Sequence, residues 1–161
     1  MAEYKLSLIR HAHADPAKIF KEDKTRSLSI QGLKQIDSLG DVIIETNEVI
    51  DFFIISPATR TKETFDALSL KINSPSGYEY MDAIYDGEVD LLIKKIHMES
   101  MNYSHIGVIG HNPMLSKIAT SFTGKNVVIN SSGWICIATS SLKAIEIDGS
   151  SIIGAHEVIV F

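Results

Sequence analysis

The stretch Val49-Ile50-Asp51-Phe52-Phe53-Ile54-Ile55 decides the fold of this chain. It consists almost entirely of residues that favour β-strands. Such a continuous apolar run is typical of a strand buried on both faces, as in a parallel sheet that helices cover on each side. Ser56-Pro57 follows directly and pairs a good capping residue with a good first helical residue, so a helix is expected to begin at Pro57. The stretch therefore predicts an α/β fold.

Further apolar runs on both sides of this stretch have the length of strands. They lie at residues 5–9, 78–81, 105–109, 134–138, 143–147 and 158–161. The last three are separated by turn residues and leave no room for helices between them. We therefore expect an antiparallel hairpin near the C-terminus.

Apolar residues at helical spacing occupy most of the segments between the earlier strands. The clearest pattern covers residues 89–96, where they fall at i, i+3, i+4 and i+7. Other helices are expected after the capping residues Ser29, Ser56 and Asn112, with Pro57 and Pro113 as the first residues of the last two. Residues 12–27 show no period and are interpreted as a loop.

The length and composition are those of one globular domain. The chain has 161 residues, of which 45% are hydrophobic and 22% are charged. The alternation of strands and helices then predicts a single domain over residues 1–161, a three-layer αβα sandwich with a mostly parallel central sheet. The net charge of −5 argues against nucleic acid or an anionic membrane as the main partner.

The sequence also indicates a compartment. No stretch approaches the roughly 20 apolar residues of a membrane helix, and Lys5 and Arg10 interrupt an N-terminal apolar run that is too short for a signal peptide. Cys136 is the only cysteine, so no intramolecular disulfide can form. We therefore expect a cytoplasmic protein.

Ionisable side chains follow three of the expected strands, each at the point where the strand ends. The three strings are Leu8-Ile9-Arg10-His11-Ala12, Ser56-Pro57-Ala58-Thr59-Arg60-Thr61 and Ile109-Gly110-His111-Asn112-Pro113. Because ligands of an open α/β sheet bind beyond the carboxyl ends of its strands, we expect the strings to meet at one edge. The pairs Ser56-Pro57 and Asn112-Pro113 would each start a helix there. The free backbone N–H groups in the first turn of a helix attract anions.

This set of side chains suits a phosphoryl group. The guanidinium groups of Arg10 and Arg60 could bind its oxygens bidentately. A neutral imidazole at His11 could attack phosphorus and leave again, and nearby arginines should lower its pKa. His111, if protonated, could donate hydrogen bonds to the phosphoryl oxygens. The residues alone indicate an anion site and leave the reaction open, since each string by itself also fits a surface pair or a helix cap.

Taken in order, the strings resemble the motifs of the histidine phosphatase superfamily, which includes phosphoglycerate mutases, acid phosphatases and phosphohistidine phosphatases. A fourth string, Asp23-Lys24-Thr25-Arg26-Ser27-Leu28-Ser29-Ile30-Gln31-Gly32, is similar to a motif of one small subgroup, the SixA-type phosphohistidine phosphatases. Ala12 in place of the usual glycine and the short chain point to the same subgroup.

The resemblance implies a reaction and a role for each residue. It implies a phosphatase with a phosphoglycerate mutase-like fold, in which His11 is the nucleophile that becomes phosphorylated. Arg10, Arg60 and His111 would complete the catalytic site and bind the phosphoryl group. Arg26 is expected at the rim of the site, and Asn112 is a further candidate for substrate binding. The resemblance implies neither a metal nor an organic cofactor.

The expected substrate is phosphohistidine on a protein, with inorganic phosphate as product. Larger members of the superfamily use an acidic residue to protonate the leaving group, and here Asp82, Asp86 and Glu88 match that position only loosely. An alkoxide needs such a proton, whereas the imidazole of phosphohistidine needs less help. Two alternatives stay open: a phosphatase of small phosphate esters, such as sugar or nucleotide phosphates, and a non-catalytic phosphate-binding module. Neither the pathway nor the oligomeric state follows from the sequence.

Overall fold

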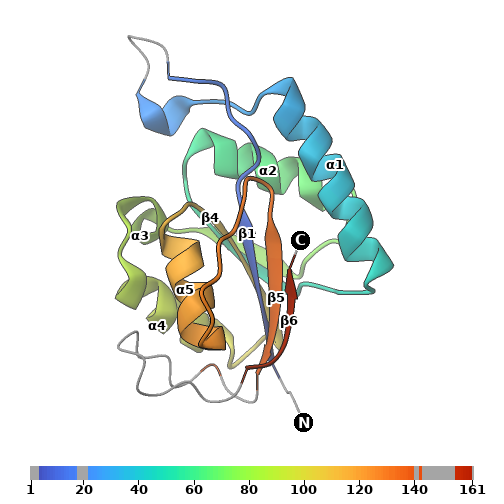
Figure 1. Cartoon of the computed structure of the whole chain (residues 1–161), viewed down its shortest axis with the longest axis vertical. Coiled ribbons are helices and arrows are strands. Elements are labelled where there is room, and N and C mark those ends of the chain that lie inside the picture. The colour runs from blue at the N-terminus through green and yellow to red at the C-terminus, as the bar shows by residue number, and fades with distance from the viewer. Residues whose placement is uncertain (1–3, 18–21, 140–141, 143–154, 161) are drawn as a thin grey trace.

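Strands from the whole length of the chain form one sheet in the computed structural model, which describes residues 4–17, 22–139, 142 and 155–160 (Figure 1). The strands are β1 (Tyr4–Arg10), β2 (Phe52–Ile55), β3 (Gly77–Tyr80), β4 (His105–Gly110), β5 (Trp134–Thr139) and β6 (Ala155–Val160). Their order across the sheet is β3-β2-β4-β1-β5-β6.

The sheet is parallel from β3 to β1 and antiparallel beyond it. β4 pairs in parallel with both β1 and β2, whereas β5 runs antiparallel to β1 and β6. This arrangement confirms the predicted α/β sandwich with a mostly parallel sheet and an antiparallel pair near the C-terminus. The strand expected at residues 143–147 lies outside the described residues.

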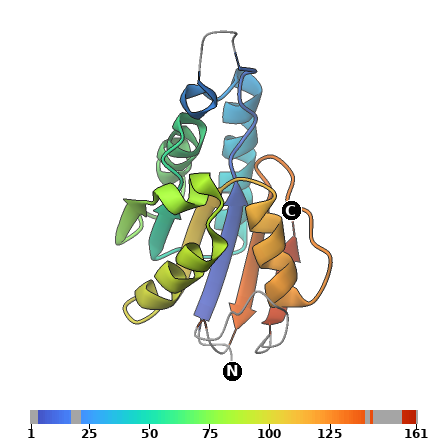
Figure 2. The ribbon, with the colours of Figure 1, turned by 90° about the vertical axis from the view of Figure 1, so that its left-hand side faces the viewer.

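Helices cover both faces of the sheet, as Figures 1 and 2 show from two directions. One face carries α1 (Ile30–Glu45) and α2 (Thr59–Ser69), and the other carries α3 (Asp82–Asp86), α4 (Val89–Glu99) and α5 (Met114–Thr123). The short helix α3 was not predicted. The expected loop over residues 12–27 contains one turn of 3-10 helix, η1 (Asp23–Thr25).

The central strands bury side chains against both helical layers. In β1, Leu6 and Leu8 pack with α4 and α5, while Ile9 packs with α1 and α2. All four residues of β2 are buried, as predicted for a strand covered on both faces. The two apolar layers fix the sheet rigidly beneath the strand ends.

Two helices begin later than the sequence predicts. Helix α2 has Ala58 as its capping residue instead of Ser56, and α5 has Pro113 instead of Asn112. The Ser56 hydroxyl instead contacts Nε2 of His111 at 2.7 Å and accepts from the backbone N–H of Ala58 at 3.5 Å. The prediction for the first helix is confirmed, since Ser29 caps α1 and accepts a hydrogen bond from the backbone N–H of Gly32.

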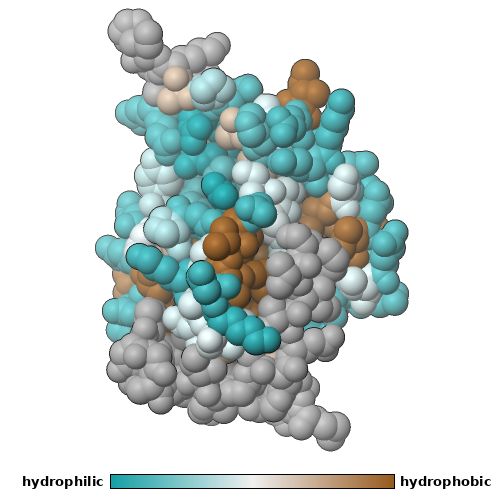
Figure 3. All heavy atoms as spheres, viewed as in Figure 1, coloured by the Kyte–Doolittle hydropathy of each residue, from teal (hydrophilic) through white to brown (hydrophobic). Residues whose placement is uncertain are grey.

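The surface of the described residues is mixed. Figure 3 shows hydrophilic side chains over much of the described part of this face, with apolar side chains gathered in a few separate groups. No helix in the described part of the chain is long and apolar enough to cross a membrane.

Candidate active site

The strand ends deliver the three sequence strings to one edge of the sheet. Arg10, the last residue of β1, lies opposite Gly110 at the end of β4. The backbone N–H of His11 donates to the carbonyl of Gly110 at 3.1 Å, and that of Ser56 donates to the carbonyl of Ile109 at 3.0 Å. Residues that are about fifty to a hundred positions apart in the chain are therefore backbone neighbours at the site.

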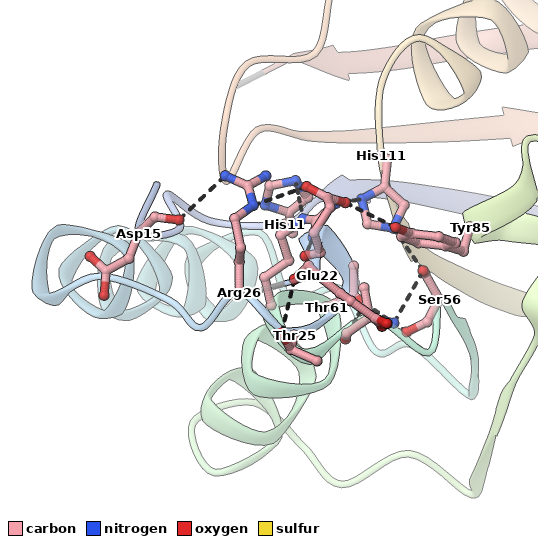
Figure 4. A network of polar contacts seen from close by, with 12 residues as sticks. His11, Asp15, Glu22, Thr25, Arg26, Ser56, Thr61, Tyr85 and His111 are labelled. Atoms are coloured by element: carbon pink, nitrogen blue, oxygen red, sulfur yellow. Dashed lines mark hydrogen bonds and ion pairs between the residues drawn. The ribbon is translucent and has the colours of Figure 1, made fainter. Parts of the chain in front are cut away.

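Arg60 lies between the two histidines that follow these strands. Its Nε donates to Nε2 of His11 at 3.3 Å, and its Nη2 lies 3.4 Å from Nδ1 of His111. The centroids of the two imidazole rings are 5.2 Å apart. The Arg60 side chain is only 7% exposed, so its charge acts on both rings with little screening by water. Figure 4 shows the two histidine rings facing the same space, with Tyr85 and Ser56 beside His111.

His11 has the protonation state of a nucleophile. Its Nδ1 lies 2.7 Å from the carbonyl oxygen of Ala12, which can only accept, so Nδ1 carries the proton. Nε2 is then the basic nitrogen, and it points toward Arg60. Burial, followed by the charges of Arg60 and Arg10, lowers the pKa of His11 to about 4. The direction agrees with the expectation from the sequence, but burial has a larger effect than the arginines.

His111 is held by two neighbours that sequence reasoning did not connect with it. Its Nε2 lies 2.7 Å from the hydroxyl of Ser56, and the edge of the Tyr85 ring packs against it at 5.7 Å between centroids. Burial, followed by the charges of Arg60 and His11, lowers the pKa of His111 to about 3. His111 is therefore neutral at pH 7 in this arrangement, whereas the role expected for it required the protonated form.

Arg10 is fixed by the loop that precedes β5. Its Nη1 donates to the carbonyl of Ile129 at 3.3 Å, and Nδ2 of Asn112 donates to the same oxygen at 2.7 Å. The other end of the Asn112 amide accepts from the hydroxyl of Ser116 at 2.8 Å, so both ends of this side chain contact the chain itself. Arg10 Nε is buried and has no hydrogen-bond partner among the described residues. It is a donor that an anion oxygen could satisfy.

Asp23 is the residue at the site that sequence reasoning missed. Its carboxylate Oδ2 accepts from Arg60 Nη2 and from the Tyr85 hydroxyl, each at 3.0 Å. Its Oδ1 accepts from Nε of Arg26 at 3.0 Å, which places Arg26 at the outer side of the site. Partial burial opposes ionisation, but the bonds from Tyr85 and Arg60 outweigh it, and the pKa of Asp23 lies below its usual value. The only signal in the sequence was the position of Asp23 three residues before Arg26.

The three acidic candidates for a proton donor lie outside this network. Asp82 is 80% exposed and pairs with Lys24 at 3.6 Å, while Asp86 and Glu88 are exposed at the end of α3 and the start of α4. The side chain of this segment that contacts the site is Tyr85. Burial and the neighbouring Asp23 raise its pKa, so the phenol keeps its proton at neutral pH.

Among the described residues, one group combines side chains that often bind metals, at the other end of the sheet. Ligand atoms of Glu48, His105 and Cys136 lie within 4.8 Å of one another. Glu48 already accepts from the Lys5 ammonium group at 2.7 Å, and Nε2 of His105 contacts the hydroxyl of Ser7 at 2.8 Å. A cation there would have to displace that ammonium group, so the contacts fit a buried structural network better than a metal site.

Solved structures share this architecture. No protein-family model matches the sequence, and no curated protein sequence matches it. A protein histidine phosphatase SixA in complex with tungstate aligns over 98% of this chain and 94% of its own, with a TM-score of 0.77 and 16% identity. A protein from Agrobacterium tumefaciens assigned as the phosphohistidine phosphatase SixA aligns over 84% and 92%, with a TM-score of 0.78 and 20% identity. The α-ribazole phosphatase of Shigella flexneri aligns over 95% and 100%, with a TM-score of 0.69 and 14% identity. The chain therefore has the fold that these phosphatases share, which is the fold that the resemblance of the sequence motifs implied.

Proposed function

We propose that this protein is a histidine phosphatase of the SixA type, which removes the phosphoryl group from phosphohistidine on a protein through a phosphorylated His11. The observation that carries the proposal is the state of His11. Its Nδ1 is fixed as a donor to Ala12, and its unprotonated Nε2 faces the guanidinium of Arg60. A phosphoryl group held by the Arg60 guanidinium would lie next to this basic nitrogen, which is the arrangement that an attack on phosphorus needs.

In the first step, Nε2 of His11 attacks phosphorus while the bond from phosphorus to the leaving nitrogen breaks. The electron pair of that bond goes to the substrate imidazole, which takes up a proton. Arg60 and Arg10 neutralise the charge on the phosphoryl oxygens, and the unpartnered Arg10 Nε supplies one of the donors.

In the second step, water attacks the phosphorus of phospho-His11. The bond from phosphorus to Nε2 breaks, its electron pair returns to Nε2, and inorganic phosphate leaves. His111 lies beside His11, with 5.2 Å between the ring centroids, and its Nε2 contacts the hydroxyl of Ser56. A phosphoryl dianion between the two rings would raise the pKa of His111, so the protonated, donating form would be reached only with substrate bound.

Two further residues have supporting roles in this proposal. Arg26, beside Asp23 at the rim, contributes positive charge where the substrate enters. Asn112 positions the Ile129 carbonyl that also binds Arg10, so it acts on the substrate through Arg10.

The placement of the acidic residues supports phosphohistidine as the substrate. Asp82, Asp86 and Glu88 do not enter the hydrogen-bond network around His11. An imidazole can depart without a strong acid beside it, whereas an alkoxide gains roughly 10²–10⁴-fold from one. The proposed partner is therefore a phosphorylated protein, and we propose a cytoplasmic location for this chain, which its single cysteine fits.

A phosphatase of small phosphate esters is the second candidate. Structures named as α-ribazole phosphatase and as mycobacterial glucosyl-3-phosphoglycerate phosphatase share the fold, the latter with a TM-score of 0.62 and 9% identity. The Tyr85 hydroxyl, which keeps its proton at neutral pH, could serve an ester leaving group.

A substrate panel tests the proposal. Purified protein is assayed for kcat/KM on a phosphorylated histidine-containing domain, phosphoramidate, a sugar phosphate and a nucleotide monophosphate. We expect the phosphohistidine domain to be turned over with the highest kcat/KM and every activity to be lost in His11→Ala. Higher kcat/KM on an ester, with a large fall in Tyr85→Phe, would support the second candidate. Binding of phosphate without turnover of any substrate would contradict both.

A further inference from the structure

We infer that the carboxylate of Asp23 is a built-in competitor for phosphate, which an incoming phosphoryl group must displace from Arg60. The inference rests on the proposed function in one respect, because it takes Arg60 as the residue that receives the phosphoryl group. It goes beyond that function by naming a residue that limits how tightly the site holds phosphate.

The donors of Arg60 are almost fully occupied. Nε donates to His11, and Nη2 contacts both the Asp23 carboxylate and His111. Nη1 donates to the backbone carbonyl of Asp23 at 2.9 Å. A guanidinium has five N–H donors, so few remain for a phosphoryl group while Asp23 stays in place.

The other donors around Asp23 are also those that an anion would need. Its carboxylate receives hydrogen bonds from Arg60, Arg26 and the Tyr85 hydroxyl. Three donors, one from α2, one from α3 and one from the residue that follows η1, thus converge on one negative group. The carboxylate carries negative charge, as a phosphoryl group does, and it accepts from donors that a phosphoryl group bound at Arg60 would need.

Sharing the site is unfavourable. A phosphoryl group at His11 would bring two negative charges close to the Asp23 carboxylate, where the nearly buried Arg60 lies in a region of low dielectric. Displacement, by contrast, requires little rearrangement of the core. The Asp23 side chain is 50% exposed, and η1 is a three-residue turn without buried residues.

The competition has consequences for turnover. Inorganic phosphate must displace Asp23 from Arg60, and it makes no contact elsewhere that could offset the free-energy cost of this displacement. Free phosphate should therefore bind weakly, and the phosphate product should leave readily. A phosphoryl group on a larger substrate can offset the displacement with contacts elsewhere on the surface. Asp23 would therefore favour attached phosphoryl groups over free phosphate.

The test is the affinity for inorganic phosphate, measured by titration calorimetry and as product inhibition, in the wild type, Asp23→Asn and Asp23→Ala. Asp90→Asn is the matched control, because Asp90 is an exposed acid on α4 and its replacement makes the same change in net charge. We expect both Asp23 variants to bind phosphate about tenfold more tightly than the wild type, as for the removal of one charge-assisted competitor, and the control to bind as the wild type does.

Unchanged or weaker phosphate binding in both Asp23 variants, with thermal unfolding that shows them folded, would overturn the inference. The outcome is separable from the proposed function. If the wild type forms phospho-His11 and the Asp23 variants bind phosphate no more tightly, the inference fails and the proposed function stands. If the variants bind phosphate more tightly and no phospho-His11 forms in any protein, the proposed function fails and the competition stands.

Discussion

At the scale of single residues, the account depends on the contact between Arg60 and His11. Arg60 Nε donates to His11 Nε2 at 3.3 Å. A proton on Nε2 would face that N–H and the positive charge of the guanidinium, so protonation of His11 is unfavourable. Burial is the larger cause, and burial and the charge of Arg60 together lower the pKa of His11 to about 4. The imidazole is therefore neutral over the whole physiological range, which is the form that attacks phosphorus.

This depressed pKa predicts an unusual dependence of activity on pH. A histidine with its ordinary pKa of about 6.5 would be mostly protonated at pH 5, whereas His11 should stay neutral until the pH approaches its own pKa of about 4. We expect kcat/KM for an acid-stable phosphate ester, corrected for ionisation of the ester, to vary little between pH 7.5 and 5.5. A loss of activity with a midpoint near pH 6.5 that follows the protonation of His11 would contradict this prediction.

The sequence was informative about those site residues that belong to strand ends. Arg10, His11 and His111 could be placed because each lies at the end of a recognisable apolar strand or directly after it. Asp23 could not, because it reaches Arg60 from a loop without periodicity, over contacts that span 37 positions. Hydrogen bonds between distant side chains leave no local pattern in a sequence.

At the scale of elements, a side-chain cap marks the start of α1. The Ser29 hydroxyl accepts from the backbone N–H of Gly32 at 3.0 Å and also contacts Nδ1 of His13 at 2.7 Å. The same reasoning failed at α2, which begins at Thr59 after Ala58, while the Ser56 hydroxyl contacts His111. A residue of a capping type therefore indicates a helix start only to within a few positions.

Replacement of Ser29 should therefore destabilise the protein. We expect Ser29→Ala to lower the free energy of unfolding by about 1 kcal/mol, since the N–H of Gly32 loses its partner. The matched control is Ser38→Ala, since Ser38 is exposed within the same helix and bonds only to the carbonyl of Lys34, one turn earlier. Urea unfolding of both variants measures the difference, and equal stabilities would show that the cap contributes nothing.

At the scale of the whole molecule, the sheet separates two groups of buried polar residues. The site lies beyond the carboxyl ends of β1, β2 and β4, and the group around His105 lies where β4 begins. The layers and the parallel core were predictable from the alternation of strands and helices. The position of β4 between β2 and β1 was not, because strand order is set by backbone pairing that the side-chain pattern does not record.

The buried His105 predicts how stability depends on pH. Burial is the main cause that lowers its pKa to about 4, whereas in the unfolded chain the value is about 6.5. Above pH 6.5 both states are neutral. As the pH falls from 6.5 to about 4, the unfolded state takes up a proton that the folded state does not, so stability is lost in this window.

We expect His105 to account for a loss of roughly 3 kcal/mol in the free energy of unfolding as the pH falls from 7 to 4. Urea unfolding at several pH values, in the wild type and His105→Gln, measures it. The variant should lose less stability on acidification than the wild type, whatever its stability at pH 7. Parallel pH profiles for the two proteins would contradict the assignment, since the buried histidines His11 and His111 are present in both.

The most direct test of the central claim is to trap the phosphorylated enzyme. The protein is mixed with a substrate that carries labelled phosphate, quenched within milliseconds without acid, digested and analysed by mass spectrometry. We predict up to one labelled phosphate per chain, on Nε2 of His11, and none in His11→Ala. Stoichiometric label that persists in His11→Ala, or that lies on His111 or another residue of the wild type, would contradict the account.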